Sequence, residues 1–346
     1  MSEPSRVVRS IVRIASSSAQ SLASRLIDRF ASVAARSSTA TWSTDPIRGR
    51  RGSSGSSKPR GRTGAFATDP SLGPARPLAF ARVKTRALNL LGRLGLLRAA
   101  YRSYEALGAL RATRRPAPPA DDGLPVPPPR LIVRVAGTAD VGWFLESGRL
   151  AAESIAESLA RHGRRVEEVG ALLDFGCGCG RVIRRWAGLG ATSIHGTDAN
   201  ERAVAWCRAN LPFARFESNG LAPPLPYANE SFDLVYALSV FTHLPEDLQL
   251  TWISELERLL RPGGLLLLTT HGERYRERLD SQERDAFDAG RVVVRWAEGA
   301  GSNLCSAFHP PEYVKESLAG RLAVVEFVPE GARGNPHQDL YMLRRR

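Results

Sequence analysis

The chain has 346 residues and a formal net charge of +13 at neutral pH. Residues 1–130 hold 23 Lys and Arg against 7 Asp and Glu, whereas residues 131–346 hold 25 against 28. The C-terminal part therefore lacks the basic surface that a polyanion needs, which disfavours nucleic acid as its partner. No apolar run reaches the ~20 residues that a bilayer-spanning helix requires. The four cysteines do not have the spacing of a secreted disulfide framework, so we expect a cytoplasmic protein.

Composition divides the first 130 residues into three segments. Residues 1–80 are rich in Arg and Ser and predict a basic, largely disordered extension. Apolar residues at helical spacing within residues 1–36 leave open a helix that binds a membrane surface or a partner. Leucines spaced by three and four predict a helical segment over 81–115, and residues 116–130 predict a stiff Pro-rich linker. An alternative is a translation start at a non-AUG codon such as that of Val83, which would leave residues 1–80 untranslated.

Residues 131–346 alternate apolar strands with amphipathic helices and predict a single domain. Strands are expected at 172–175, 192–197, 214–217, 232–238 and 264–270, and helices at 146–162, 181–189, 201–210 and 246–260. The tail breaks this rhythm with an expected hairpin of 292–294 and 304–308, a helix at 313–318, and closing strands at 323–328 and 340–343. Strand–helix alternation of this kind predicts a doubly wound α/β sheet.

Three glycines follow the first predicted strand in the sequence L-L-D-F-G-C-G-C-G at 172–180. Glycine is needed where the backbone bends sharply and approaches a ligand. The G-x-G-x-G spacing differs from the G-x-G-x-x-G of dinucleotide enzymes, which disfavours a nicotinamide dehydrogenase. Asp174, two positions before the first glycine, would repel a pyrophosphate. It suits a cationic ligand such as S-adenosylmethionine, whose ammonium group it can bind.

Polar residues also follow the next two predicted strands. Asp198 ends the second strand, where a carboxylate is placed to accept hydrogen bonds from both ribose hydroxyls of a nucleoside. Asn219 follows the third strand, where its amide can bind the edge of an adenine. The fourth and fifth strands are introduced by P-L-P-Y-A-N-E-S-F-D-L-V at 224–235 and L-R-P-G-G at 260–264.

In their order and spacing, these motifs over about residues 140–346 resemble the class I S-adenosylmethionine-dependent methyltransferase family, small-molecule type. The resemblance implies a seven-stranded Rossmann-like sheet of order 3-2-1-4-5-7-6 with strand seven antiparallel. It also implies S-adenosyl-L-methionine as the cofactor, bound across the carboxyl ends of strands one, two and four. The residues predicted to bind the cofactor are Asp174, Gly176, Cys177, Gly178, Gly180, Asp198, Ala199, Asn219, Gly220, Leu221 and Ser239.

Cys177 and Cys179 place a C-x-C inside the glycine turn and depart from the family pattern. A structural metal site needs four suitably spaced ligands, which are missing, so no metal is expected. We interpret the two cysteines as small residues that fit a tight turn.

The loop after the fourth strand reads A-L-S-V-F at 237–241 and bears on the acceptor. It lacks the Asn/Asp-Pro-Pro-aromatic motif of the family members that methylate amino groups, and no Pro-Cys nucleophile is present. We therefore predict a small-molecule acceptor, with the methyl group going to a hydroxyl of a sugar, glycolipid or secondary metabolite. His243, His271 and His309 are the candidate bases, although a reaction without a base remains open.

Two further points stay open. Trp143 and Phe144 either form a wall of the pocket or pack in the core. The competing functions are a cofactor-binding module without turnover, and nucleic-acid or membrane-surface binding through the basic N-terminal third. The sequence makes no prediction about the oligomeric state.

Overall fold

The computed structural model describes residues 91–92, 95–112, 120–335 and 337–346, and every structural statement below refers to them. The chain divides into two units, Met1–Arg93 and Leu94–Arg346, and the described residues from 95 onward belong to the second. Helix α3 (Leu97–Ala112) lies in the second unit and in the predicted helical segment. The predicted extension of residues 1–80 lies outside the described residues. No described helix combines the length and apolar character that crossing a membrane requires.

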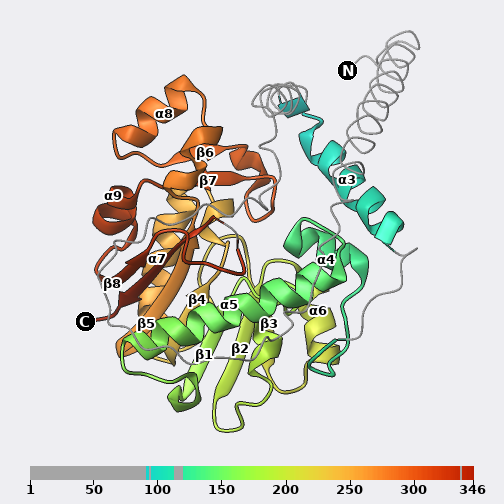
Figure 1. Ribbon diagram of the computed structural model, residues 1–346, viewed down its shortest axis with the longest axis vertical. Helices are drawn as coiled ribbons and strands as arrows, with labels where there is room; N and C mark the ends of the chain where they lie inside the picture. The colour runs from blue at the N-terminus through green and yellow to red at the C-terminus, as the bar shows by residue number, and fades with distance from the viewer. Residues whose placement is uncertain (1–90, 93–94, 113–119, 336) are drawn as a thin grey trace, which may run out of the picture. The chain divides into compact units, whose positions relative to one another are not determined.

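Seven strands form one sheet in the order β3-β2-β1-β4-β5-β9-β8 (Figure 1). They are β1 (Ala171–Phe175), β2 (Ser193–Asp198), β3 (Arg215–Ser218), β4 (Phe232–Ala237), β5 (Leu260–Thr270), β8 (Ala323–Val328) and β9 (Asp339–Arg344). Strand β9 is antiparallel to both of its neighbours, and the strands from β3 to β5 are parallel. Numbered within this sheet, the order is 3-2-1-4-5-7-6 with strand seven antiparallel, so the predicted topology is confirmed.

Helices α5 (Val141–Arg161) and α6 (Glu201–Asn210) cover one face of the sheet, and α7 (Glu246–Leu259) and α9 (Pro311–Tyr313) cover the other. Helix α4 (Pro129–Ala136) packs against α3 and α5. Helix α8 (Ser281–Asp288) packs against Val293 and Phe308, outside this sheet. Alternate residues of a strand point to opposite faces, so Leu172 packs with α5 and α6 while Leu173 packs with α7. Every residue of β1 is buried, as expected of a central parallel strand with helices on both sides. The predicted hairpin forms as the antiparallel pair β6 (Val293–Arg295) and β7 (Ser306–Phe308).

Residues 120–130 differ from the expected stiff Pro-rich linker because they pack against the rest of the domain. Helix α4 begins at Pro129, where the fixed φ of proline suits the first turn, and its C-cap Gly137 is left-handed at φ 68°. Upstream of it, the Asp122 carboxylate accepts hydrogen bonds from the buried guanidinium of Arg184 at 2.5 and 2.8 Å. Residues 120–136 are therefore attached to the sheet domain beside the glycine turn, rather than spaced away from it.

The prediction of a helix over 181–189 is wrong, because this stretch forms only a short 3-10 helix at Ile183–Trp186. Its hydrogen bonds run from residue i+3 to residue i, as from Arg185 N to Val182 O at 2.9 Å. Left-handed Gly180 lies just before the segment, and Gly188 and Gly190 follow it, which leaves no room for a regular helix.

Candidate functional site

The glycine turn after β1 has a backbone that other residues cannot adopt without strain. Gly176, Gly178 and Gly180 have φ values of +82°, +56° and +84°. A Cβ atom would lie 2.3 Å from Val240 Cγ2 at the first glycine and 2.6 Å from Val135 Cγ2 at the second. The turn is therefore enclosed by side chains from the β4 loop and from α4, so both its conformation and its surroundings require glycine.

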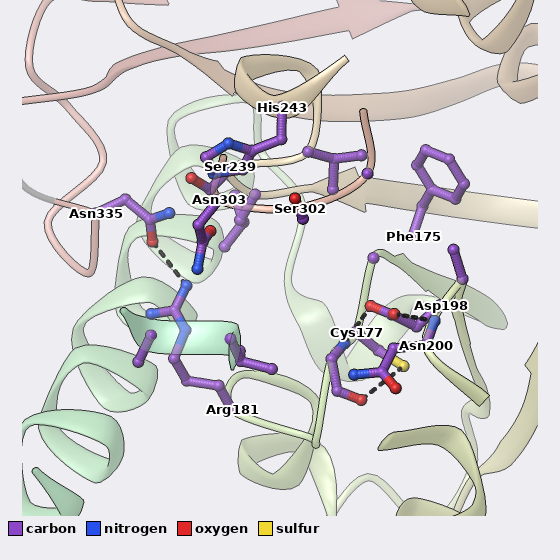
Figure 2. Close-up of a pocket in the computed structure, with 18 of the residues that line it drawn as sticks. Phe175, Cys177, Arg181, Asp198, Asn200, Ser239, His243, Ser302, Asn303 and Asn335 are labelled. Carbon is purple, nitrogen blue, oxygen red and sulfur yellow. Dashed lines mark hydrogen bonds between the residues drawn. The ribbon is translucent and has the colours of Figure 1, made fainter. Parts of the chain in front are cut away.

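Asp198 at the end of β2 holds this turn in place. Its carboxylate accepts a hydrogen bond from Gly178 N at 2.8 Å and another from Asn200 N at 2.7 Å (Figure 2). Burial raises the pKa of Asp198, while these two N–H groups act in the opposite direction. Each carboxylate oxygen keeps a lone pair that can accept a further hydrogen bond from a ligand hydroxyl.

The turn borders a cavity of about 420 Å³ at the carboxyl ends of the parallel strands. Its wall also includes residues from α4, α5, the β6–β7 connection and the β8–β9 loop. Ten of the eleven predicted cofactor-binding residues line it: Asp174, Gly176, Cys177, Gly178, Asp198, Ala199, Asn219, Gly220, Leu221 and Ser239. Gly180 is absent from the lining and packs against Leu211 instead. The structure thus brings together residues from the ends of four strands, β1 to β4, that are far apart in the sequence.

Asp174 presents a buried carboxyl group to this cavity. It is 4% exposed, and burial raises its pKa to about 7 against the opposing effects of the Tyr236 hydroxyl and the charge of Arg181. A cationic ligand group beside this carboxylate would favour its ionised form, as an ammonium group does.

Asn219 has an unused hydrogen-bond acceptor at the same cavity. Its Nδ2 donates to Gly220 O at 2.7 Å, but its Oδ1 is buried without a partner among the described residues. A buried polar atom of this kind is costly unless a ligand satisfies it, and the amino group of an adenine would do so. Together with the glycine turn and Asp198, these features fit an adenosine-containing cofactor.

Two of the three candidate bases face the cavity. His243 donates Nδ1–H to Cys305 O at 2.7 Å, and His271 donates Nδ1–H to Ala307 O at 3.1 Å. A carbonyl only accepts, so both neutral rings carry a free lone pair on Nε2. Burial lowers the pKa of both side chains, that of His271 well below its ordinary value. The ring centroids lie 6.3 Å apart, and His271 also stacks on Tyr275.

His309 lies behind the cavity wall and does not join the other two histidines there. It is fully buried, its Nε2 donates to Gln249 Oε1 at 3.0 Å, and burial lowers its pKa to about 3. Trp143 lines the cavity and is 38% exposed, whereas Phe144 is buried in the core.

Several lining residues were missed in the sequence because they come from late loops without a motif. Gln338 donates to Ser239 Oγ at 2.9 Å and accepts from Thr269 Oγ1 at 2.7 Å, which supports the left-handed Ser239 at φ 60°. Arg181 and Asn335 form a second hydrogen-bonded pair in the wall (Figure 2). Of these residues, only Arg181 could have been suspected from the sequence, because it directly follows the glycine turn.

The β6–β7 connection reaches across to α4 at the edge of the cavity. Asn303 Nδ2 donates to Arg134 O at 2.8 Å, and Gly301 N donates to His243 O at 2.9 Å. Among the described residues, no group of three or more His, Cys, Asp or Glu side chains is placed to hold a metal ion. All four cysteines, including the C-x-C of the turn, are buried free thiols.

Comparison with known proteins agrees with this geometry. The profile of a family described as a methyltransferase domain matches residues 173–268. An uncharacterized methyltransferase of Synechocystis sp. is 36% identical over 140 residues, covering 40% of this chain and 59% of the relative. A trans-aconitate 2-methyltransferase of Variovorax paradoxus is 32% identical over 139 residues, covering 39% of this chain and 49% of the relative.

A third relative is matched over more of its length. A ubiquinone biosynthesis O-methyltransferase of Maricaulis maris is 31% identical over 199 residues, covering 55% of this chain and 73% of the relative. The chain spans only about half the length of the two relatives above. The match covers most of the Maricaulis protein, and the strand order and the glycine turn agree with it. The chain therefore belongs to the class I S-adenosylmethionine-dependent methyltransferase family.

Proposed function

We propose that this protein transfers a methyl group from S-adenosylmethionine to a hydroxyl of a small molecule such as a sugar, a glycolipid or a secondary metabolite. The observation that carries the proposal is the hydrogen bond between His243 Nδ1 and the Cys305 carbonyl, which fixes the tautomer of the ring. Because its Nδ1–H is held by Cys305 O, its basic Nε2 is available in the same cavity as the glycine turn. When bound, the cofactor supplies a methyl group that its sulfonium sulfur already activates.

In this proposal the chain holds the cofactor at both of its ends. Asp198 accepts hydrogen bonds from the ribose hydroxyls, and Asn219 Oδ1 accepts from the adenine amino group. Asp174 binds the ammonium of the amino-acid end. The remaining predicted residues of the turn and the loops keep side chains out of this space or provide its walls. Fixing the reactants in this way supplies much of the rate enhancement of an in-line displacement.

His243 then acts as the general base. Its Nε2 would accept the proton of the acceptor hydroxyl as the methyl group passes to that oxygen and the carbon–sulfur bond breaks, which leaves S-adenosylhomocysteine as the second product. The Cys305 carbonyl would stabilise the resulting imidazolium. His271 lies on the same wall with its own Nε2 free, and we propose it as a second acceptor for substrate hydroxyls. His309 has no place in this scheme because it does not line the cavity.

A small-molecule acceptor is supported by charge and by the relatives. The unit Leu94–Arg346 holds equal numbers of basic and acidic residues, 31 of each. The Variovorax relative is named for trans-aconitate and the Maricaulis relative for the biosynthesis of ubiquinone. Both trans-aconitate and ubiquinone are small molecules. The four buried free thiols fit the proposed cytoplasmic location.

The test is transfer of a labelled methyl group to a panel of glycans and hydroxylated metabolites, with RNA and protein panels beside it. We expect activity on a small-molecule hydroxyl, and His243→Gln should reduce it by ~10²–10⁴-fold while leaving the affinity for S-adenosylhomocysteine unchanged. His162→Gln, at the exposed end of α5, is the matched control and should retain activity. Activity on the macromolecules alone would refute the proposal. Cofactor binding without turnover on any panel would instead indicate a cofactor-binding module.

A further inference from the structure

Arg181 places a buried cation in the wall of the cavity without a matching anion. Arg181 is only 9% exposed to solvent. Its Nη1 donates to Gly334 O at 3.1 Å and its Nη2 donates to Asn335 Oδ1 at 2.8 Å, and both acceptors are neutral. Among the described residues, no carboxylate lies within ion-pair distance of this guanidinium. A buried charge without a counter-ion is unfavourable, so the site is suited to receive an anionic group.

The packing around Arg181 holds it in this place. A Cβ atom at Gly148 of α5 would lie 2.0 Å from Arg181 O, and one at Gly334 of the β8–β9 loop would lie 2.1 Å from Ser147 O. The helix, the glycine turn and the loop therefore meet at van der Waals contact around the arginine. Figure 2 shows the guanidinium directed toward Asn335 at the margin of the cavity.

The nearest relevant acid is Asp174, which attracts Arg181 electrostatically without forming an ion pair with it. Both residues line the cavity. A ligand that carries an ammonium group and a carboxylate on the same carbon atom, as an amino acid does, can therefore contact both groups at once. The planar guanidinium presents parallel N–H donors that match the two oxygens of a carboxylate.

We propose that Arg181, with Asn335 beside it, forms a carboxylate-binding subsite of the cavity. The proposal rests on the proposed function, since it concerns the same methyl-transfer site. Two sources of the carboxylate share this chemistry. One is the amino-acid end of the cofactor, whose ammonium binds Asp174, and the other is a carboxylate of the acceptor.

Calorimetry on the full chain tests the subsite with two ligands, S-adenosylhomocysteine and its decarboxylated analogue, which keeps the ammonium. If the carboxylate belongs to the cofactor, Arg181→Gln weakens S-adenosylhomocysteine by ~10- to 100-fold and leaves the analogue unchanged. If it belongs to the acceptor, both nucleosides bind normally. Succinate or citrate then binds the S-adenosylhomocysteine-saturated wild type, and Arg181→Gln abolishes that binding.

Arg185→Gln is the matched control, because Arg185 lies in the same segment but pairs with Asp121 at 2.7 Å and does not line the cavity. It should bind every ligand as the wild type does. Arg181→Lys, which keeps the charge, and Asn335→Ala should show smaller losses of the same selectivity. These two variants decide the matter if Arg181→Gln does not fold.

The subsite is refuted if the Arg181 and Asn335 variants bind all these ligands as the wild type does. Equal losses for S-adenosylhomocysteine and its decarboxylated analogue would refute it as well. A wild-type protein that fails to bind S-adenosylhomocysteine would contradict the proposed function instead, so the two failures are distinguishable.

Discussion

His243 and His271 each donate Nδ1–H to a main-chain carbonyl of the segment that ends in β7. This contact, rather than the identity of the residue alone, makes each ring present an unprotonated Nε2 to the cavity. His309 illustrates the contrast, because its Nε2 donates to Gln249 and its ring is enclosed in the core. The three histidines were equivalent candidates in the sequence, and their hydrogen-bond partners distinguish them.

The pH dependence of turnover follows from His243. Burial lowers its pKa below the ordinary value of 6.5, so the basic neutral form persists to lower pH than for a free histidine. With saturating S-adenosylmethionine, which keeps Asp174 ionised, we expect the acid-side decline of kcat/KM for a hydroxyl acceptor to have its midpoint below pH 6.5. A pH–rate profile checks this, and a decline with a midpoint above pH 7 would contradict it.

The stability at acidic pH depends in part on His309. Its pKa is lowered from 6.5 to about 3, so between these values the unfolded chain binds a proton that the folded chain does not. The contribution of His309 to the free energy of unfolding is therefore complete above pH 6.5 and is lost as the pH falls toward 3. In the wild type, the free energy of unfolding should fall between pH 7.5 and pH 5 partly for this reason. In His309→Gln this fall should be smaller by about 2 kcal/mol. Urea unfolding at the two pH values measures this change, and an unaltered pH dependence in the variant would contradict it.

Asp198 links cofactor binding to the shape of the glycine turn. Asp198→Ala removes the acceptor of two main-chain N–H groups, from Gly178 and Asn200. We expect a loss of about 1–3 kcal/mol of stability and a loss of affinity for S-adenosylhomocysteine of at least ~10-fold. Thermal unfolding and calorimetry measure the two effects, and unchanged affinity would exclude Asp198 from the cofactor site.

At the level of elements, helix α6 and the strand ends were predictable from local pattern. The predicted helix at 201–210 coincides with α6, because its apolar residues recur at helical spacing and its buried side is the one that this spacing predicts. The segment 181–189 has similar helical composition but forms a 3-10 helix, since the glycines around it must follow the fold of the turn. The early start of α5 at Val141 depends on Asp140, whose side chain accepts from Trp143 N at 3.0 Å.

The contact of the glycine turn with α4 is testable by substitution. Both Gly178 and Gly163 have a positive φ. Gly178→Ala adds a Cβ atom 2.6 Å from Val135 Cγ2, whereas the Cβ atom of Gly163→Ala has no neighbour within 4 Å. Gly163→Ala should therefore cost only the ~1–2 kcal/mol of the left-handed backbone. Gly178→Ala should cost more and should weaken S-adenosylhomocysteine binding by at least ~10-fold.

Val135→Ala in the Gly178→Ala background provides the check on this explanation. Removing the two Cγ atoms should restore part of the stability, which a double-mutant cycle measures by chemical unfolding. Additive effects of the two substitutions would show that the contact with α4 is not the cause.

At the level of the whole molecule, positive charge and the cavity belong to different parts of the chain. Residues 1–93 hold 17 Lys and Arg against 4 Asp and Glu, whereas every residue that lines the cavity lies at or beyond Arg134. We expect a chain of residues 94–346 to bind S-adenosylhomocysteine within about twofold of the full chain. Any salt-dependent binding to RNA or anionic vesicles should be confined to the full chain. Calorimetry and a salt titration check the two parts, and polyanion binding by residues 94–346 would contradict the charge argument.

The sequence by itself determined the alternation of strands and helices, the glycine turn and the acidic and amide residues at the strand ends, because these depend on local periodicity and on short motifs. The strand order followed from the resemblance to the methyltransferase family. Only the tertiary structure decided which histidines reach the cavity, and that Arg181, Asn335, Gln338 and Asn303 join its wall. These side chains are placed by contacts between distant segments, such as Arg181 with Asn335, 154 residues apart, and Asn303 with Arg134, 169 residues apart. Local pattern carries no record of such contacts, since they arise only when the β8–β9 loop packs against α5 and the glycine turn.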